Sequence, residues 1–163
     1  MALETNIHTH VWSDAGLHAA LTKLILSREA VEPSLQVSNV GGWHSAPDLL
    51  ESGHTVVSEL ALRIRTDAAA VGAAGRPLHA WANVMREGAY VIAHRHAAEV
   101  WSGVYYVDAG SDGSSLITFA RGLEAVRIAP RSGLLLLFPG DLLHSVAVYT
   151  GRTPRISVGF NLS

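Results

Sequence analysis

The chain of 163 residues contains no cysteine, which excludes disulfide bonds, thiolate catalysis and zinc sites built on thiolates. Charged side chains are also few, at 16% of all residues, and the formal net charge of −2 gives no basic footprint for nucleic acid. The longest strongly apolar run, Leu134 to Phe138, is far too short to cross a bilayer. The first residues lack the layout of a signal peptide. We therefore expect a cytoplasmic protein without a nucleic-acid or membrane partner.

Hydrophobic residues, in contrast, are abundant, at 48% of the chain, which is typical of a compact globular protein with one core. The length predicts a single domain over residues 1–163. Apolar residues at helical spacing predict two long helices, over 14–30 and over 54–71. We expect this helical N-terminal part, residues 1–76, to pack on a sheet made by the rest of the chain.

From residue 77 to 163 the pattern changes to short runs of Val, Ile, Leu and aromatic residues, separated by turns that contain Gly, Pro or Asp. The predicted fold class is therefore mainly β with N-terminal helices. Closely spaced strands of this kind are typical of a jelly roll or small barrel, the architecture that includes cupins. The eight predicted strands cover 78–86, 90–96, 101–107, 115–119, 124–129, 133–138, 143–149 and 155–162.

Two histidines, His94 and His96, stand one residue apart at the end of the predicted strand 90–96. Side chains alternate along a strand, so both imidazoles should lie on one face. Neutral imidazoles are good ligands for transition metals, and His144, near the start of the strand predicted at 143–149, is the best candidate for a third ligand. Such a His-x-His pair alone is often only a solvated strand face. The position of His144 favours a metal site.

The last predicted strand places Arg155, Ser157 and Asn161 on one face, opposite strongly apolar neighbours. This polar face is either exposed to solvent or lines a wet cavity, and the His-x-His pair favours the cavity. Arg155 and Ser157 then indicate a site for an anionic co-substrate. Asn83, on the first predicted strand, is on the face that would reach the same cavity.

Other histidines and the tryptophans receive simpler interpretations. His8 and His10 repeat the His-x-His spacing, but we expect a frayed terminus there. His18, His44 and His54 fall in predicted helices or turns and are interpreted as surface or capping residues, and the four tryptophans as core residues. No serine lies in a Gly-x-Ser-x-Gly context, so acyl transfer is set aside.

The order of these motifs resembles that of the 2-oxoglutarate- and Fe(II)-dependent oxygenases, in particular a bacterial group of that superfamily. The segments that carry the resemblance span residues 38 to 161, most of the chain. They are Ser38-Asn39-Val40-Gly41-Gly42-Trp43, Trp81-Ala82-Asn83-Val84, His94-Arg95-His96, Ser102-Gly103-Val104-Tyr105-Tyr106, Phe138-Pro139-Gly140-Asp141 through His144, and Arg155-Ile156-Ser157 through Phe160-Asn161.

The resemblance implies a double-stranded β-helix with Fe(II) held by His94 and His144. It implies that Arg155 and Ser157 hold the distal carboxylate of 2-oxoglutarate, whose decarboxylation at the metal drives hydroxylation of a small-molecule or peptide substrate. A guanidinium fork matches a carboxylate in shape and charge. The superfamily usually has Asp or Glu where this chain has His96.

We expect His96 to be the third ligand, with Glu99 as the alternative if a bulge redirects it. A cupin-type metalloenzyme, with His94, His96, Glu99 and His144 as ligands and no use of 2-oxoglutarate, remains an open alternative. So does a non-catalytic protein that binds a metal or a small ligand. A homodimer is the expected assembly.

Overall fold

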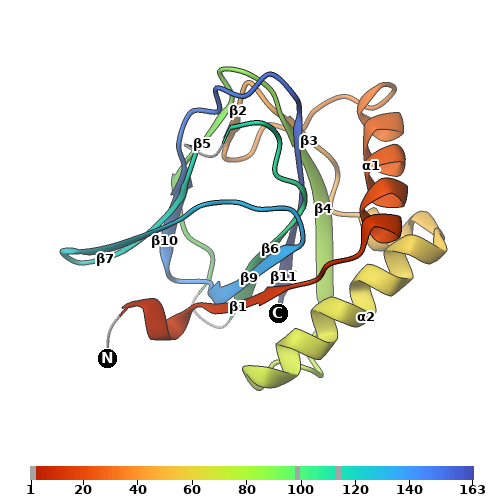
Figure 1. The fold of residues 1–163 in the computed structure, drawn as a ribbon. Coiled ribbons are helices and arrows are strands. Elements are labelled where there is room, and N and C mark those ends of the chain that lie inside the picture. The colour runs from red at the N-terminus through yellow and green to blue at the C-terminus, as the bar shows by residue number, and fades with distance from the viewer. Residues whose placement is uncertain (1–2, 98–99, 113–114) are drawn as a thin grey trace.

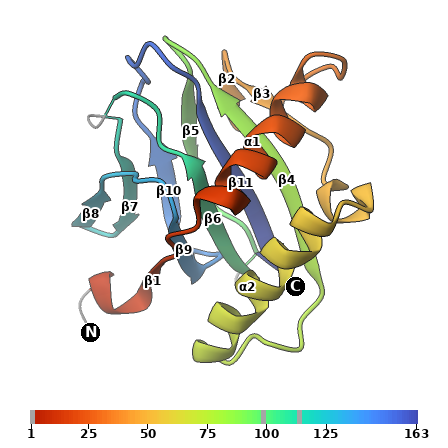
Figure 2. The same cartoon turned by 45° about the vertical axis from the view of Figure 1, so that its right-hand side comes forward.

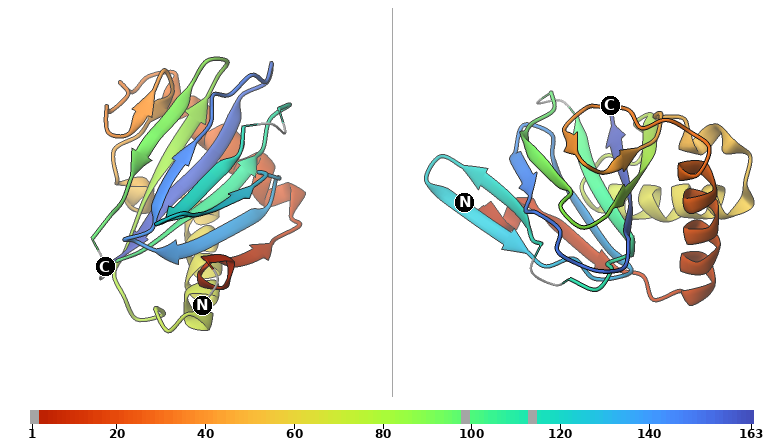
Figure 3. Two further views of the ribbon diagram at one scale, coloured as in Figure 1. Left: turned by 90° about the vertical axis from the view of Figure 1, so that its left-hand side faces the viewer. Right: turned by 90° about the horizontal axis from the view of Figure 1, so that it is seen from above.

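The computed structural model describes residues 3–97, 100–112 and 115–163. Within these ranges the strands form two facing sheets, and both long helices lie on the outer side of one of them (Figures 1 and 2). The view from above shows the same layering, with the helices on one side of the β-sandwich (Figure 3). The chain thus has three layers, and the interior between the two sheets is the place for a cavity.

All eight strands predicted after residue 77 are present, as β4 to β11. Three further short strands, β1 to β3, and a short 3-10 helix near the start of the chain were not predicted. The strands are β1 (His8–Val11), β2 (Asn39–Val40), β3 (Trp43–His44), β4 (Leu78–Met85), β5 (Tyr90–His94), β6 (Trp101–Asp108), β7 (Ile117–Arg121), β8 (Glu124–Ile128), β9 (Leu134–Pro139), β10 (Leu143–Val146) and β11 (Arg155–Leu162).

The strands pair in the order β1-β9-β6-β11-β4-β3 in one sheet and β2-β5-β10-β7-β8 in the other, with antiparallel ladders throughout. From β4 to β11 the strands alternate between the two sheets, except that β7 and β8 pair as neighbours in one sheet, and this arrangement is the predicted double-stranded β-helix. Two consequences matter for the site: β5 lies beside β10, and β11 lies between β4 and β6.

The helices are α1 (Ala15–Glu29) and α2 (Thr55–Ala70). Asp14 caps α1 by accepting a hydrogen bond from the backbone N–H of Leu17, at 2.9 Å. Each helix buries one apolar stripe in a shared core with the outward side chains of β4, β6 and β11. The inward side chains of these strands are therefore free to line the interior. No helix in the described ranges is long and apolar enough to span a membrane.

The prediction of a frayed N-terminus at His8 and His10 is wrong. Both residues belong to β1, which pairs with β9, and both rings lie 2.8 Å from the same carboxylate oxygen of Asp67 on α2. Trp12 Nε1 donates to the other oxygen at 2.9 Å. Asp67 is only 4% exposed, and a buried carboxylate needs such donors. These contacts tie the N-terminal strand to the helical layer.

Candidate metal and co-substrate site

The structure brings His94, His96 and His144 together, with one ligand atom from each lying within 4.8 Å of the others. His94 and His144 are cross-strand partners on β5 and β10, and their ring centroids are 4.2 Å apart. β5 ends at His94, so His96 lies two residues beyond it rather than inside the predicted strand. Its ring is still 5.3 Å from that of His94 and 5.4 Å from that of His144.

The turn after β9 holds His96 in place through residue 140. The backbone N–H of His96 donates to the carbonyl of Gly140, and the N–H of Gly140 donates to the carbonyl of Val100, both at 2.7 Å. A Cβ atom on Gly140 would lie 2.5 Å from the carbonyl oxygen of Ala97 and 2.7 Å from that of Val100. Only glycine therefore allows this close approach of the two backbones.

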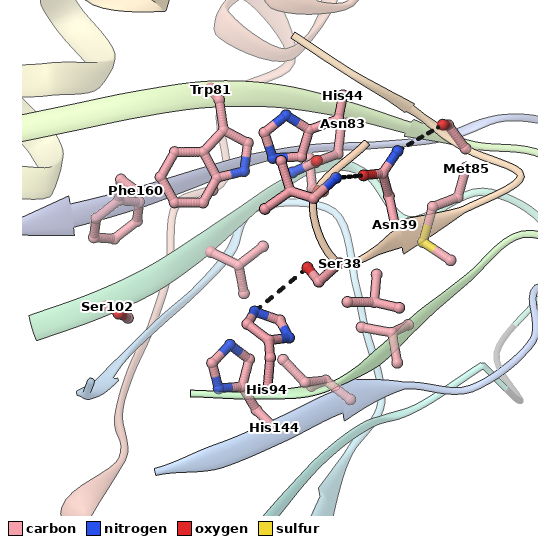
Figure 4. A pocket seen from close by; sticks show the side chains of 18 of the residues that line it. Ser38, Asn39, His44, Trp81, Asn83, Met85, His94, Ser102, His144 and Phe160 are labelled. Carbon is pink, nitrogen blue, oxygen red and sulfur yellow. Dashed lines mark hydrogen bonds between the residues drawn. The ribbon is translucent and has the colours of Figure 1, made fainter. Parts of the chain in front are cut away.

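Hydrogen bonds also fix which nitrogen is available for a metal in the rings of His94 and His144. Nδ1 of His94 donates to the carbonyl of Ile92 at 2.9 Å, and Nδ1 of His144 donates to that of Leu142 at 2.8 Å. A carbonyl only accepts, so Nδ1 carries the proton and Nε2 has a free lone pair in each neutral ring. Carbonyl partners of this kind orient metal-binding histidines. The hydroxyl of Ser38 lies 3.5 Å from Nε2 of His94 (Figure 4).

Two of the three rings, those of His96 and His144, are held in the neutral form that binds metal. Burial lowers the pKa of His144 to about 4, and burial followed by the nearby His94 lowers the pKa of His96. Phe138 packs edge-on against His144, with ring centroids 4.9 Å apart. The donor set, three imidazole nitrogens in a partly buried pocket, fits Fe(II) as well as other first-row metals. The alternative ligand Glu99 lies outside the described residues.

Arg155, the first residue of β11, lines the same cavity as the three histidines and is 1% exposed. Its Nε, Nη1 and Nη2 donate to the carbonyls of Ala109, Ser115 and Asp112 at 3.1, 2.8 and 2.7 Å. A guanidinium has five N–H groups, so one on each Nη remains for another acceptor. Burial lowers the pKa of Arg155, but an arginine stays protonated. The result is an oriented, buried cation.

Three neutral polar side chains surround the Arg155 end of the cavity. Ser157 pairs across the sheet with Asn83 on β4 and with Tyr106 on β6, and all three line the cavity. Tyr106 was not singled out in the sequence, although alternation along the strand 101–107 puts it on one face with Ser102. Burial raises its pKa far above the usual value, so the phenol stays neutral and can donate a hydrogen bond.

The cavity has a volume of about 460 Å³, within the range of small-molecule sites. One wall contains His44 on β3 and Trp81 on β4, whose rings are nearly parallel, at 13°, with centroids 5.6 Å apart (Figure 4). The interpretation of His44 as a surface or capping residue is therefore wrong, because its side chain is 9% exposed and faces the interior. Trp81 lines the cavity rather than only filling the core.

A double-stranded β-helix with a cluster of side chains that could hold a metal ion in its interior is typical of the broad class of cupin-like metalloproteins. Within that class, the family model described as "Putative 2OG-Fe(II) oxygenase" matches residues 79–124 and 120–161, more than half of the sequence. The chain belongs to this family of 2-oxoglutarate- and Fe(II)-dependent oxygenases, whose cofactor is Fe(II) and whose co-substrate is 2-oxoglutarate. This membership decides against the cupin-type alternative without 2-oxoglutarate.

Solved structures show the same fold. A prolyl-4-hydroxylase from Pseudomonas putida matches with a TM-score of 0.77 and 15% identity over 96% of this chain and 91% of that one. A Trichoplax adhaerens prolyl hydroxylase, in complex with a hypoxia inducible factor peptide fragment, matches with a TM-score of 0.76 and 14% identity over 98% of this chain and 84% of that one. The epimerase SnoN, in complex with Fe3+, alpha ketoglutarate and nogalamycin RO, matches with a TM-score of 0.75 and 15% identity over 97% of this chain and 79% of that one. No curated protein matches the sequence significantly.

Proposed function

We propose that this oxygenase holds Fe(II) through Nε2 of His94, Nε2 of His144 and an imidazole nitrogen of His96, and that Arg155 binds 2-oxoglutarate. The observation that carries the proposal is the shared cavity, which three imidazoles and one buried guanidinium line together. When bound, Fe(II) and 2-oxoglutarate supply the oxygen-activating chemistry, in which decarboxylation of 2-oxoglutarate to succinate accompanies hydroxylation of the substrate. The chain supplies position and protection from water.

The role of Arg155 follows from its contacts. Three carbonyls fix the plane of its guanidinium, so the two remaining N–H groups have a set direction before any ligand arrives. A carboxylate of 2-oxoglutarate would accept both and neutralise a buried charge. The hydroxyls of Ser157 and Tyr106 would add hydrogen bonds to the same carboxylate, and Asn83 lies beside Ser157.

Position 96 sets the character of the metal site. A histidine in place of the usual carboxylate gives three neutral ligands and no negative one. The charge of the ligands therefore favours Fe(II) less strongly than the common triad of two histidines and one carboxylate does. A non-catalytic metal-binding protein is therefore the second candidate, because three imidazoles also suit Zn(II). Turnover of 2-oxoglutarate is the property that separates the two.

The test combines binding with turnover. Binding of 2-oxoglutarate to the Fe(II)-loaded protein is measured by calorimetry without oxygen, and succinate is then measured by NMR after oxygen is admitted. Arg155→Gln should weaken 2-oxoglutarate binding by at least about 30-fold, since loss of a buried charged contact costs roughly 2–5 kcal/mol. Metal affinity should be unchanged. Arg127→Gln, at an exposed position on β8, is the matched control.

Equal affinity for 2-oxoglutarate in Arg155→Gln and the wild type would contradict the role of Arg155. Tight metal binding without any succinate, with several candidate substrates present, would favour the non-catalytic candidate.

Four further expectations complete the proposal. The substrate is a small molecule or a peptide, which is supported by relatives whose structures hold nogalamycin RO or a peptide fragment. Residues 1–163 act as one domain, which is supported by the packing of α1 and α2 on the larger sheet. A homodimer and a cytoplasmic location stay predictions from the sequence. Light scattering after gel filtration checks the homodimer, and cell fractionation checks the location.

A further inference from the structure

Apart from Arg155 and the proposed metal ligands, the cavity offers almost no charged side chains in the part of the chain that the structure describes. Among the described residues that line it, Arg155 is the one permanently charged side chain, and none is Asp, Glu or Lys. The proposed function assigns Arg155 to 2-oxoglutarate. A substrate ammonium or carboxylate inside the cavity would therefore lose its hydration without gaining a partner of opposite charge, which is costly. The part of the substrate that enters should be uncharged.

The wall formed by His44 and Trp81 is flat. Gly159 on β11 makes this arrangement possible, since a Cβ atom there would lie 2.6 Å from the indole of Trp81. The indole thus lies directly against the backbone of β11, and the ring of His44 lies nearly parallel to it (Figure 4). Flat aromatic surfaces bind flat rings well, by offset or edge-on contacts.

His44 also offers a hydrogen-bond acceptor to the cavity. Its Nδ1 donates to the carbonyl of Ser45 at 2.7 Å, so in the neutral ring Nε2 carries a lone pair. No described residue pairs with that nitrogen. Burial lowers the pKa of His44, which keeps the ring neutral and the acceptor present at neutral pH. An acceptor of this kind, on a ring that is mostly buried, is best satisfied by an N–H or O–H group.

The solvent-exposed rim of the cavity is apolar as well. Leu35, Val37 and Tyr90 line the cavity and are still 41%, 66% and 37% exposed. An apolar part of the substrate would cover these side chains as it enters.

We propose that this oxygenase acts on an uncharged substrate with a flat ring that lies against His44 and Trp81 and donates a hydrogen bond to Nε2 of His44. The inference rests on the proposed function, because it assumes that metal, 2-oxoglutarate and substrate share one cavity. His44 and Trp81 are then the residues that determine which substrates are accepted.

The test uses a small set of indoles with the protein loaded with Zn(II) and 2-oxoglutarate, which prevents turnover. Affinities are measured by ligand-observed NMR. Indole is flat, neutral and has an N–H donor, whereas 1-methylindole lacks the donor and should bind about fivefold more weakly, as expected for one hydrogen bond. In a pair of similar size, 3-ethylindole should bind at least about tenfold more tightly than the cationic tryptamine, because its ethyl group carries no charge to desolvate.

Variants assign the effect to the wall. His44→Phe keeps a ring and removes the acceptor, so indole and 1-methylindole should bind equally, while the affinity for 2-oxoglutarate should not change. Trp81→Leu should weaken both indoles. His79→Gln, at an exposed position on the same strand as Trp81, is the control and should leave all affinities unchanged.

The outcomes separate the two proposals. If the metal-loaded wild type does not bind 2-oxoglutarate, the proposed function fails, whatever the indoles do. If 2-oxoglutarate binds, the substrate inference alone is overturned by any of three results. These are equal binding of indole and 1-methylindole to the wild type, binding of tryptamine as tight as that of 3-ethylindole, and no detectable binding of any indole.

Discussion

Gly140→Ala is the substitution that should detach His96 from the metal site while leaving the rest of the fold intact. A methyl group at position 140 would lie 2.5 and 2.7 Å from two backbone carbonyl oxygens, those of Ala97 and Val100. Backbone atoms cannot turn aside as a flexible side chain can, so the segment that carries His96 must move away.

The size of the effect follows from the contacts that this movement breaks. Two hydrogen bonds at 2.7 Å join residue 140 to His96 and Val100, and each contributes about 1 kcal/mol net. Without these two bonds His96 is no longer held beside the other two histidines, and ordering it again on metal binding costs about the same 2 kcal/mol, which corresponds to roughly 30-fold weaker metal binding. His94 and His144 are held by the ladder between β5 and β10 and should still bind.

The assay is competition with a chromophoric chelator for Fe(II) or Zn(II), with thermal unfolding of the metal-free protein measured in parallel. Gly75→Ala is the matched control, because no atom lies within 4 Å of a Cβ atom built there. Metal affinity equal to that of the wild type in Gly140→Ala would refute the reasoning. An unfolding temperature that falls in step with metal affinity would show that the change acts on the whole fold instead.

Three other predictions concern His96, Asp67 and His44. His96→Asp recreates the common carboxylate triad and should retain or increase Fe(II) affinity, whereas His96→Ala should lower it, and wild-type affinity in His96→Ala would exclude His96 as a ligand. Asp67→Asn replaces one of two accepting oxygens by a donor that faces other donors, so the free energy of unfolding in urea should fall by about 2 kcal/mol relative to the exposed control Glu124→Gln. Because burial lowers the pKa of His44 in the folded state, the unfolded state binds more protons below the usual pKa of about 6.5. Stability should therefore fall as the pH falls through and below that value, and the fall should be smaller in His44→Gln; identical pH profiles in urea unfolding would contradict this.

The elements that the sequence predicts well are those whose local pattern and final environment agree. Strands β4 to β11 alternate or run apolar between clear turn residues, and both helices have one apolar stripe that ends in the shared core. The His-x-His motif is also predicted from local pattern, because it stands at the end of the clearly marked strand β5. Its partner His144 is recognisable because it lies near the start of β10, the strand that the double-stranded β-helix places beside β5.

The parts that the sequence does not reveal are made by pairing rather than by local pattern. β2 and β3 are two residues long, too short for any periodicity, and they exist because the edges of β5 and β4 offer unpaired backbone groups. His44 reaches the cavity only through the pairing of β3 with β4. The end of the cavity with the proposed metal ligands is thus built on or just beside strands with strong signals, and the wall proposed for the substrate is built partly on strands with weak ones. Segments of the second kind tolerate changes in length and sequence better, since less of the core depends on them. We therefore expect substitutions in the wall to change the accepted substrate while the proposed metal ligands stay in place.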